Sequence, residues 1–148
     1  MICTRRSAIK LAFAALACGG AAALASCGSN TSIVGTWIDE DGSYEEGGWT
    51  LVFKDDGTIV EPDGSSLTSL YGNPVKWEKY PIETVQQGGK TYGLFHYTYL
   101  NEDGGMTYRG YAVEGNTAYE LYSADYFADF INTGALPATN HFEKWTRK

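Results

Sequence analysis

The chain lacks cysteine over nearly all of its length. Its three cysteines, Cys3, Cys18 and Cys27, all lie within the first 27 of 148 residues. The rest of the chain therefore holds no disulfide, no thiol nucleophile, no redox pair and no cysteine-ligated zinc. Many small domains rely on disulfides. A domain built from residues 28–148 has to be stabilised by its hydrophobic core instead.

Basic residues are scarce outside the N-terminal segment. Three of the 11 basic residues (Arg5, Arg6 and Lys10) and none of the 18 acidic ones lie in residues 1–26, so the remainder carries a net charge of −10. An acidic domain repels phosphate backbones and anionic lipid headgroups. We therefore expect no nucleic-acid partner and no polybasic surface that docks on a membrane.

Long apolar runs are also missing, with one exception near the N-terminus. Residues 11–25 are apolar and rich in alanine, but they are interrupted at Cys18-Gly19-Gly20. The run is shorter than the roughly 20 continuous apolar residues of a membrane-spanning helix. A basic start, an apolar stretch and small residues at its end are typical of a secretory signal peptide. We expect residues 1–26 to be a signal peptide, rather than a retained transmembrane helix.

The end of this segment, Leu24-Ala25-Ser26-Cys27, resembles the lipobox of bacterial lipoproteins. The resemblance implies acylation of the Cys27 sulfur, cleavage after Ser26 and an extracytoplasmic protein held at a membrane by its lipid, with residues 27–32 as a tether. Each buried CH₂ of an acyl chain contributes about 0.8 kcal/mol to membrane binding. The alternative is an ordinary cleavage site beside an incidental cysteine. Residues 4–10 also resemble a twin-arginine export signal, which leaves the export route open between Sec and twin-arginine.

Composition indicates an all-β domain over residues 33–148. The chain from Cys27 onward has 20 aromatic residues and 16 glycines, which favour pleated surfaces and turns. Alternating side chains and turn residues predict strands at 33–38, 49–54, 58–61, 75–85, 91–100, 106–113, 117–122 and 141–147. Residues 62–74 are polar and predict a loop. One amphipathic helix is expected at 124–132, before the last strand.

Two of these predicted strands carry further information. Pro81 restricts residues 75–85 to a sheet edge or a bulge, because proline cannot donate to the ladder. Residues 91–100 are apolar or aromatic on both faces, which predicts a central strand covered on both sides. About eight short antiparallel strands in hairpin order fit a small up-and-down β-barrel.

The sequence Gly35-Thr36-Trp37 on the first predicted strand, followed by residues 51–58 with Asp56-Gly57-Thr58, resembles the lipocalins and bacterial lipocalin-like lipoprotein domains. A helix before the final strand is also lipocalin-like, whereas the family's Thr-Asp-X-X-Tyr motif is missing. The resemblance implies a barrel whose closed end is plugged by Trp37, lying beneath a basic side chain of the last strand such as Arg147.

Tyrosines on neighbouring predicted strands are the candidate ligand-binding residues. An eight-stranded barrel either is filled by its own side chains or holds one small ligand. A small apolar or amphipathic ligand would contact the tyrosine rings and be oriented by their hydroxyls. The alternative is that each ring simply packs the core or the outer face. The candidates are Tyr92, Tyr97, Tyr99, Tyr108, Tyr111 and Tyr119.

No catalytic, metal or cofactor site is expected. His96 and His141 are 45 residues apart, and a zinc site would need both of them with a carboxylate. The acidic turns at 39–42 and 102–104 lack the full spacing of a calcium loop. No nucleophile elbow, phosphate loop or His-paired serine is present, so the sequence favours a binding protein over an enzyme.

A protein-interaction module is the alternative function. Small barrels can act as inhibitors or accessory subunits, and loops carry function more often than scaffolds do. Residues 62–74, with Leu67, Leu70 and Tyr71 among glycine and serine, are the segment expected to contact a protein partner. A hollow, aromatic-lined interior would favour a small ligand, whereas a filled interior with an exposed apolar loop would favour a protein.

Overall fold

The computed structural model describes residues 31–39 and 49–148. Residues 31–148 form one compact unit. The predicted signal peptide, Cys27 and most of the predicted acidic turn at 39–42 lie outside the described residues. Within the described part, no helix combines the length and the apolar character needed to cross a membrane.

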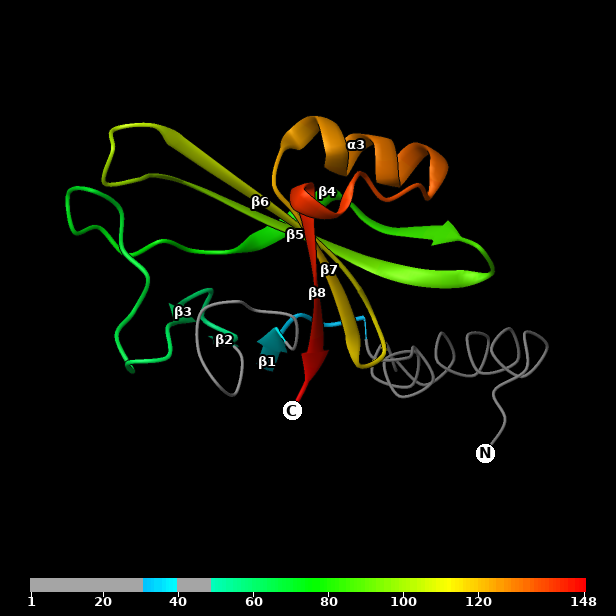
Figure 1. Ribbon diagram of the computed structural model, residues 1–148. Coiled ribbons are helices and arrows are strands. Elements are labelled where there is room, and N and C mark those ends of the chain that lie inside the picture. Colours follow the sequence, from blue (N-terminus) through cyan, green and yellow to red (C-terminus); the bar gives the residue numbers. More distant parts are fainter. Residues whose placement is uncertain (1–30, 40–48) are drawn as a thin grey trace. The chain divides into compact units, whose positions relative to one another are not determined.

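The unit is an eight-stranded antiparallel sheet that curls into a half-barrel (Figure 1). The strand order is β3-β2-β1-β8-β7-β6-β5-β4, so neighbours in sequence are neighbours in the sheet except at β3 and β4, and the first strand pairs with the last. This confirms the predicted all-β, up-and-down architecture. The strands are β1 (Gly35–Asp39), β2 (Trp49–Phe53), β3 (Ile59–Val60), β4 (Glu78–Gln87), β5 (Lys90–Leu100), β6 (Met106–Glu114), β7 (Thr117–Leu121) and β8 (Phe142–Arg147).

Residues 61–77 bridge the gap between the edge strands β3 and β4. The gap is crossed by an isolated bridge between Thr58 and Lys76 and by a hydrogen bond of 2.9 Å from the Trp77 N–H to the Gly57 carbonyl. Leu67 donates its N–H to the Ile59 carbonyl at 2.8 Å and accepts from the Val75 N–H at 2.9 Å. The segment predicted as a loop is therefore hydrogen-bonded across the open side of the half-barrel.

A proline and a glycine account for the register shift in β4 and for the turn between β2 and β3. Pro81 lies on the edge strand β4, where the register shifts between Lys79 and Thr84, as its missing N–H predicts. The Asp55-Asp56-Gly57 turn between β2 and β3 places Gly57 at φ 88°, a conformation that glycine adopts without strain. The predicted edge strand at Pro81 and the turn between β2 and β3 are therefore both present.

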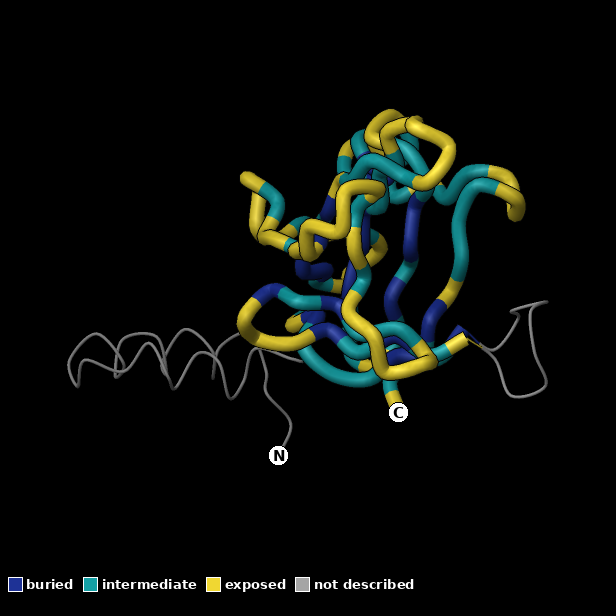
Figure 2. Tube along the Cα trace, turned by 90° about the vertical axis from the view of Figure 1, so that its left-hand side faces the viewer, coloured by how far each residue is buried: buried dark blue, intermediate teal, exposed yellow. Residues whose placement is uncertain are grey.

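The concave face of the sheet carries the larger hydrophobic core. Its members are Ile33, Trp37, Leu51, Phe53, Ile59, Val75, Phe95, Tyr97, Tyr111, Val113, Ala118 and Trp145. The segment that precedes β1 crosses β5 at Gly93, where any Cβ would overlap the Thr31 carbonyl oxygen. Buried stretches of chain alternate with exposed turns in Figure 2.

Helix α3 (Ala124–Thr133) covers the outer face of the sheet (Figure 1). Phe127 and Phe130 are buried against β5, β6 and β7, and Gly110 leaves room for the Phe127 ring, which a Cβ would overlap. The predicted helix is thus confirmed, and so is the prediction that residues 91–100 are covered on both sides.

The helix begins at a side-chain cap. The Ser123 hydroxyl accepts a hydrogen bond of 3.2 Å from the Tyr126 N–H, one of the donors that a helix start leaves without a backbone partner. We expect Ser123→Ala to lower the free energy of unfolding by about 1 kcal/mol, measured by urea denaturation. Ser123→Asn is the control, because asparagine caps equally well and should retain nearly all of the stability. Equal losses in the two variants would contradict this role.

Candidate functional site

Trp37 is buried at the end of the half-barrel where β1 pairs with the last residues of β8. The Arg147 guanidinium lies 4.3 Å from the centre of the Trp37 ring. Trp37 Nε1 donates to the Ile33 carbonyl at 2.7 Å. Arg147 donates to the carbonyls of Val34 at 2.7 Å and Ser32 at 2.6 Å. These contacts hold the segment before β1 across this end.

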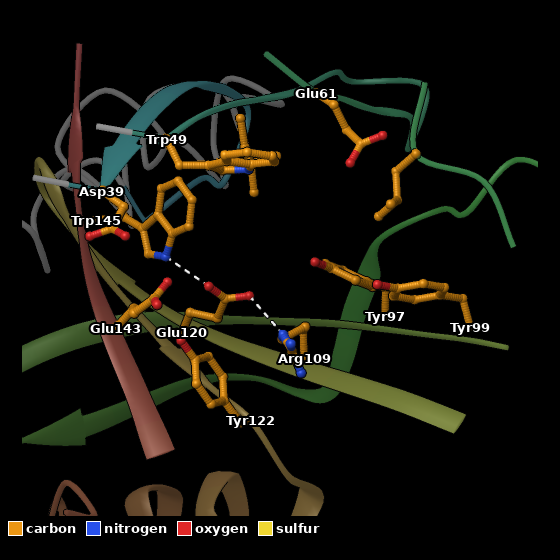
Figure 3. Close-up of a pocket in the computed structure, with 12 residues that line it drawn as sticks. Asp39, Trp49, Glu61, Tyr97, Tyr99, Arg109, Glu120, Tyr122, Glu143 and Trp145 are labelled. Carbon is orange, nitrogen blue, oxygen red and sulfur yellow. Dashed lines mark hydrogen bonds and ion pairs between the residues drawn. The ribbon is translucent and has the colours of Figure 1, made fainter. Parts of the chain in front are cut away.

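A cavity of about 410 Å³ lies toward the opposite end of the same strands (Figure 3). On β1, Trp37 pairs with Arg147, whereas Asp39 pairs with Trp49 and Trp145, which line the cavity. The volume is within the roughly 300–1,000 Å³ range of small-molecule sites. The lining residues are Asp39, Trp49, Leu51, Glu61, Leu67, Tyr97, Tyr99, Arg109, Glu120, Tyr122, Glu143 and Trp145.

Aromatic side chains supply much of the cavity wall. Tyr97 and Tyr99 lie on β5 with ring centres 6.1 Å apart, and their hydroxyls face the cavity in Figure 3. Trp49 and Trp145 lie across from them, and Leu67 comes from the segment that fills the gap between β3 and β4. Aromatic rings bind apolar groups and, through their faces, cations.

A buried carboxylate, Glu120 of β7, forms the base of the cavity. It is 4% exposed and both of its oxygens have partners. Oε1 accepts from the Tyr111 hydroxyl at 2.7 Å and lies 3.1 Å from Arg109 Nε, while Oε2 accepts from Trp145 Nε1 at 2.8 Å (Figure 3). The Tyr97 and Tyr111 hydroxyls are 3.3 Å apart, which extends the network to β5. Four strands are joined by these contacts.

Burial changes the titration of this network. Desolvation and, to a smaller extent, the charge of Glu143 raise the pKa of Glu120, whereas Arg109 and the hydrogen bonds from Tyr111 and Trp145 lower it; the net result is a pKa of about 7. Desolvation and the negative charge of Glu120 also raise the pKa of Tyr97 and Tyr111 above their ordinary value. Both hydroxyls therefore stay protonated at neutral pH and can donate hydrogen bonds.

A second cavity, of about 530 Å³, shares three lining residues with the first: Glu61, Leu67 and Tyr99. It lies between the segment that fills the gap and the β5–β6 turn, and its other lining residues are Thr68, Ser69, Leu70, Gly72, Asn101, Glu102 and Asp103. The two cavities adjoin, and together they have room for a longer ligand than the first cavity alone could hold.

The structure divides the six candidate tyrosines between the two faces of the sheet. Tyr97 and Tyr99 line the first cavity, and Tyr111 is buried behind Glu120. The other three, Tyr92, Tyr108 and Tyr119, pack on the outer face against Phe127 or Phe130 of α3. The six therefore do not form one site, because side chains alternate between faces along each strand and the helix buries the outer set.

The histidines lie apart from the cavity. His96 packs against the Tyr80 and Tyr108 rings on the outer face, with Nε2 3.7 Å from a Glu78 oxygen. His141 contacts the Tyr126 ring at a centroid distance of 4.8 Å. Within residues 31–39 and 49–148, no group of three or more potential ligands is arranged to hold a metal ion.

Sequence reasoning did not identify the charged part of the site or the two tryptophans that line it. These residues are Asp39, Glu61, Arg109, Glu120, Glu143, Trp49 and Trp145. One signal was available for Arg109 and Glu120. Arg109 shares the parity of Tyr111 and Val113 on one predicted strand, and Glu120 shares that of Ala118 on the next, so both lie on the face of the sheet that carries these core residues.

No protein-family model, curated protein or solved structure matches this chain.

Proposed function

We propose that this protein is a lipid-anchored, extracytoplasmic binding protein that holds a small amphipathic ligand in the open end of a lipocalin-like half-barrel. The observation that carries the proposal is the cavity of about 410 Å³, which is lined by aromatic side chains above a hydrogen-bonded buried carboxylate. The lipobox-like Leu24-Ala25-Ser26-Cys27 supports the membrane attachment.

Binding without catalysis accounts best for the polar groups of the site. A general base needs a free lone pair within reach of a substrate proton. Glu120 has the perturbed pKa expected of such a base, but it is only 4% exposed, and Arg109, Tyr111 and Trp145 take three of its four lone-pair sites. A carboxylate held in this way fixes the cavity wall and the positions of its aromatic neighbours.

Native mass spectrometry tests the proposal most directly. A form that begins at Gly28, exported in its own host without lipidation, is expected to carry a co-purifying small molecule, seen as a discrete mass increment that is lost on mild activation. The same form refolded from denaturant is the control, and it should give the bare protein mass. A bare mass from the native preparation would contradict the ligand-binding function.

A protein-interaction module remains the second candidate, supported by one observation. Leu70 is 42% exposed and Tyr71 is 77% exposed on the segment that fills the gap between β3 and β4. The Leu70 N–H donates to the Leu100 carbonyl at 2.8 Å, which fixes this apolar tip beside the end of β5. A bare mass in the experiment above would favour this candidate.

A further inference from the structure

The charges that line the first cavity are unequal in sign. Its four carboxylates come from four parts of the chain: β1, β7, β8 and the segment after β3. They are Asp39, Glu61, Glu120 and Glu143. Among the described lining residues, Arg109 is the one cationic side chain, and it is paired with Glu120 at 3.1 Å. The cavity therefore carries excess negative charge.

The guanidinium of Arg109 is also engaged on its other sides. Its centre lies 4.5 Å from the middle of the Tyr122 ring, and Nη1 donates to the Tyr108 carbonyl at 3.0 Å. Arg109 therefore has little capacity left to neutralise an acidic ligand, and the pairing with Glu120 cancels its charge.

The second cavity also carries more negative than positive charge. Glu102 and Asp103 line it together with the shared Glu61, and none of its described lining residues is Lys, Arg or His. A ligand that enters through this side passes carboxylates before it reaches the aromatic wall. An anion would be repelled along the whole route.

From this charge pattern, together with the aromatic wall, we infer that the ligand is an organic cation, a molecule with an ammonium group on an apolar body. The inference rests on the proposed binding function and adds the sign of the ligand's charge. The apolar body contacts Tyr97, Tyr99 and Leu67, and the ammonium is attracted by Glu143 and Glu61 from the two sides of the cavity, while ring faces add a cation–π attraction. A neutral apolar ligand would gain nothing from these carboxylates.

Repulsion inside the unliganded site supports the inference. Glu143 raises the pKa of Glu120, so the two carboxylates already oppose one another across the cavity base. A bound cation reduces that repulsion, whereas a bound carboxylate increases it. The site is therefore electrostatically complementary to a cation.

Isothermal titration with three eight-carbon probes tests this. Octylamine, octanol and octanoate share a chain and differ at pH 8 in head-group charge. The protein is the form that begins at Gly28, which contains all of the described core residues, with cooperative unfolding checked by circular dichroism. We expect octylamine to bind about tenfold more tightly than octanol, and octanoate to bind more weakly than either.

Matched variants test which carboxylates cause the expected preference for octylamine. Glu143→Gln and Glu61→Gln each remove one cavity charge with little change in shape, and each should weaken octylamine about threefold or more while leaving octanol unchanged. Glu83→Gln is the control, because Glu83 pairs with Lys79 at the surface of β4 and lines neither cavity. It changes the net charge equally and should leave octylamine binding unaltered.

The outcomes distinguish failure of the proposed ligand-binding function from failure of the inference that the ligand is a cation. If none of the three probes binds, the proposed ligand-binding function fails and the inference fails with it. If octanol or octanoate binds as tightly as octylamine, the binding function stands and the cationic ligand is rejected. If Glu83→Gln weakens octylamine as much as both cavity variants do, the preference reflects net charge alone and the inference is overturned.

Discussion

Replacement of Arg109 by methionine is expected to lower the free energy of unfolding by about 3–5 kcal/mol at pH 8, and by much less at pH 5. The reason is the position of Glu120, which is 4% exposed and has Arg109 Nε 3.1 Å from its Oε1. Removal of one member of a buried ion pair leaves the other charge desolvated and unpaired. Methionine preserves most of the arginine stem, so the variant tests the charge rather than the packing.

The pH dependence follows from the direction of the pKa shift. Burial raises the pKa of Glu120 in the folded protein to about 7 from its ordinary value of 4.5. The folded state therefore binds more protons than the unfolded state between these values. The contribution of Glu120 to stability is largest below pH 4.5 and is lost as the pH rises through 7, by about 3 kcal/mol in total.

Loss of Arg109 removes the largest effect that lowers this pKa, so the value rises further in the variant. At pH 5 Glu120 is then protonated and neutral in the folded state, which explains the smaller loss there. Urea denaturation at both pH values measures the difference. The double variant Arg109→Met/Glu120→Gln is the control, since it removes both charges of the pair and should be more stable than Arg109→Met at pH 8. Equal losses at pH 5 and pH 8 in the single variant would contradict this account.

The strands could be predicted from the sequence because their local signals agree with the fold. The alternation of Trp49, Leu51 and Phe53 fixes which face of β2 is buried, and Asp56-Gly57 places the following turn. Pro81 correctly indicated an edge strand with a register shift. These features depend on neighbours in sequence, for which the physical constraints of turns and pleats are sufficient.

The length of β3 and its hydrogen-bond partners at the open side of the half-barrel could not be predicted from the sequence in the same way. Residues 58–61 predict a third barrel strand of ordinary length, yet β3 comprises only Ile59 and Val60. Its remaining hydrogen bonds go to residues 65–67 of the segment that fills the gap. That choice of partner is made by tertiary packing, since Leu67 and Val75 are drawn onto the concave core.

The candidate site was only partly accessible to sequence reasoning. The density of tyrosines on β5, β6 and β7 suggested one aromatic surface, but the parity of each position decides which face it occupies. Tyr97 and Tyr99 share one parity and face the cavity, whereas Tyr92 has the other and packs against Phe130. The sequence could have separated these sets once α3 was assigned to the outer face.

The pairing of Arg109 with Glu120 could have been predicted from the turn between β6 and β7, which sets the register of these two strands. Gly115 and Asn116 form a two-residue hairpin loop, with Gly115 at φ 61°, so the strand register follows directly from Glu114 opposite Thr117. That register places Tyr111 opposite Glu120, and Arg109 on the same face one pair further along. The roles of Trp145 and Asp39 could not be derived in this way, because they depend on the pairing of the first strand with the last.

Truncation of Trp37 to alanine is expected to lower the free energy of unfolding by about 3–5 kcal/mol. Trp37 is 1% exposed and packs within the concave core, and its Nε1 donates to the Ile33 carbonyl at 2.7 Å. The variant loses this packing and this hydrogen bond. It also leaves the Arg147 guanidinium without the ring that lies 4.3 Å from it. The described domain contains no cysteine, so no disulfide offsets the loss.

Two companion variants distinguish the ring from the cation. Trp37→Phe retains an aromatic face for Arg147 and should lose less than half as much stability as Trp37→Ala. Arg147→Lys retains the charge but not the fork that reaches both Ser32 and Val34, so it should release the segment before β1. Urea denaturation followed by far-ultraviolet circular dichroism measures the first effect, and hydrogen exchange of the Val34 amide measures the second. A loss below about 1 kcal/mol in Trp37→Ala would show that this end of the barrel is closed by other contacts, because the burial of a tryptophan in a packed core contributes several times that amount.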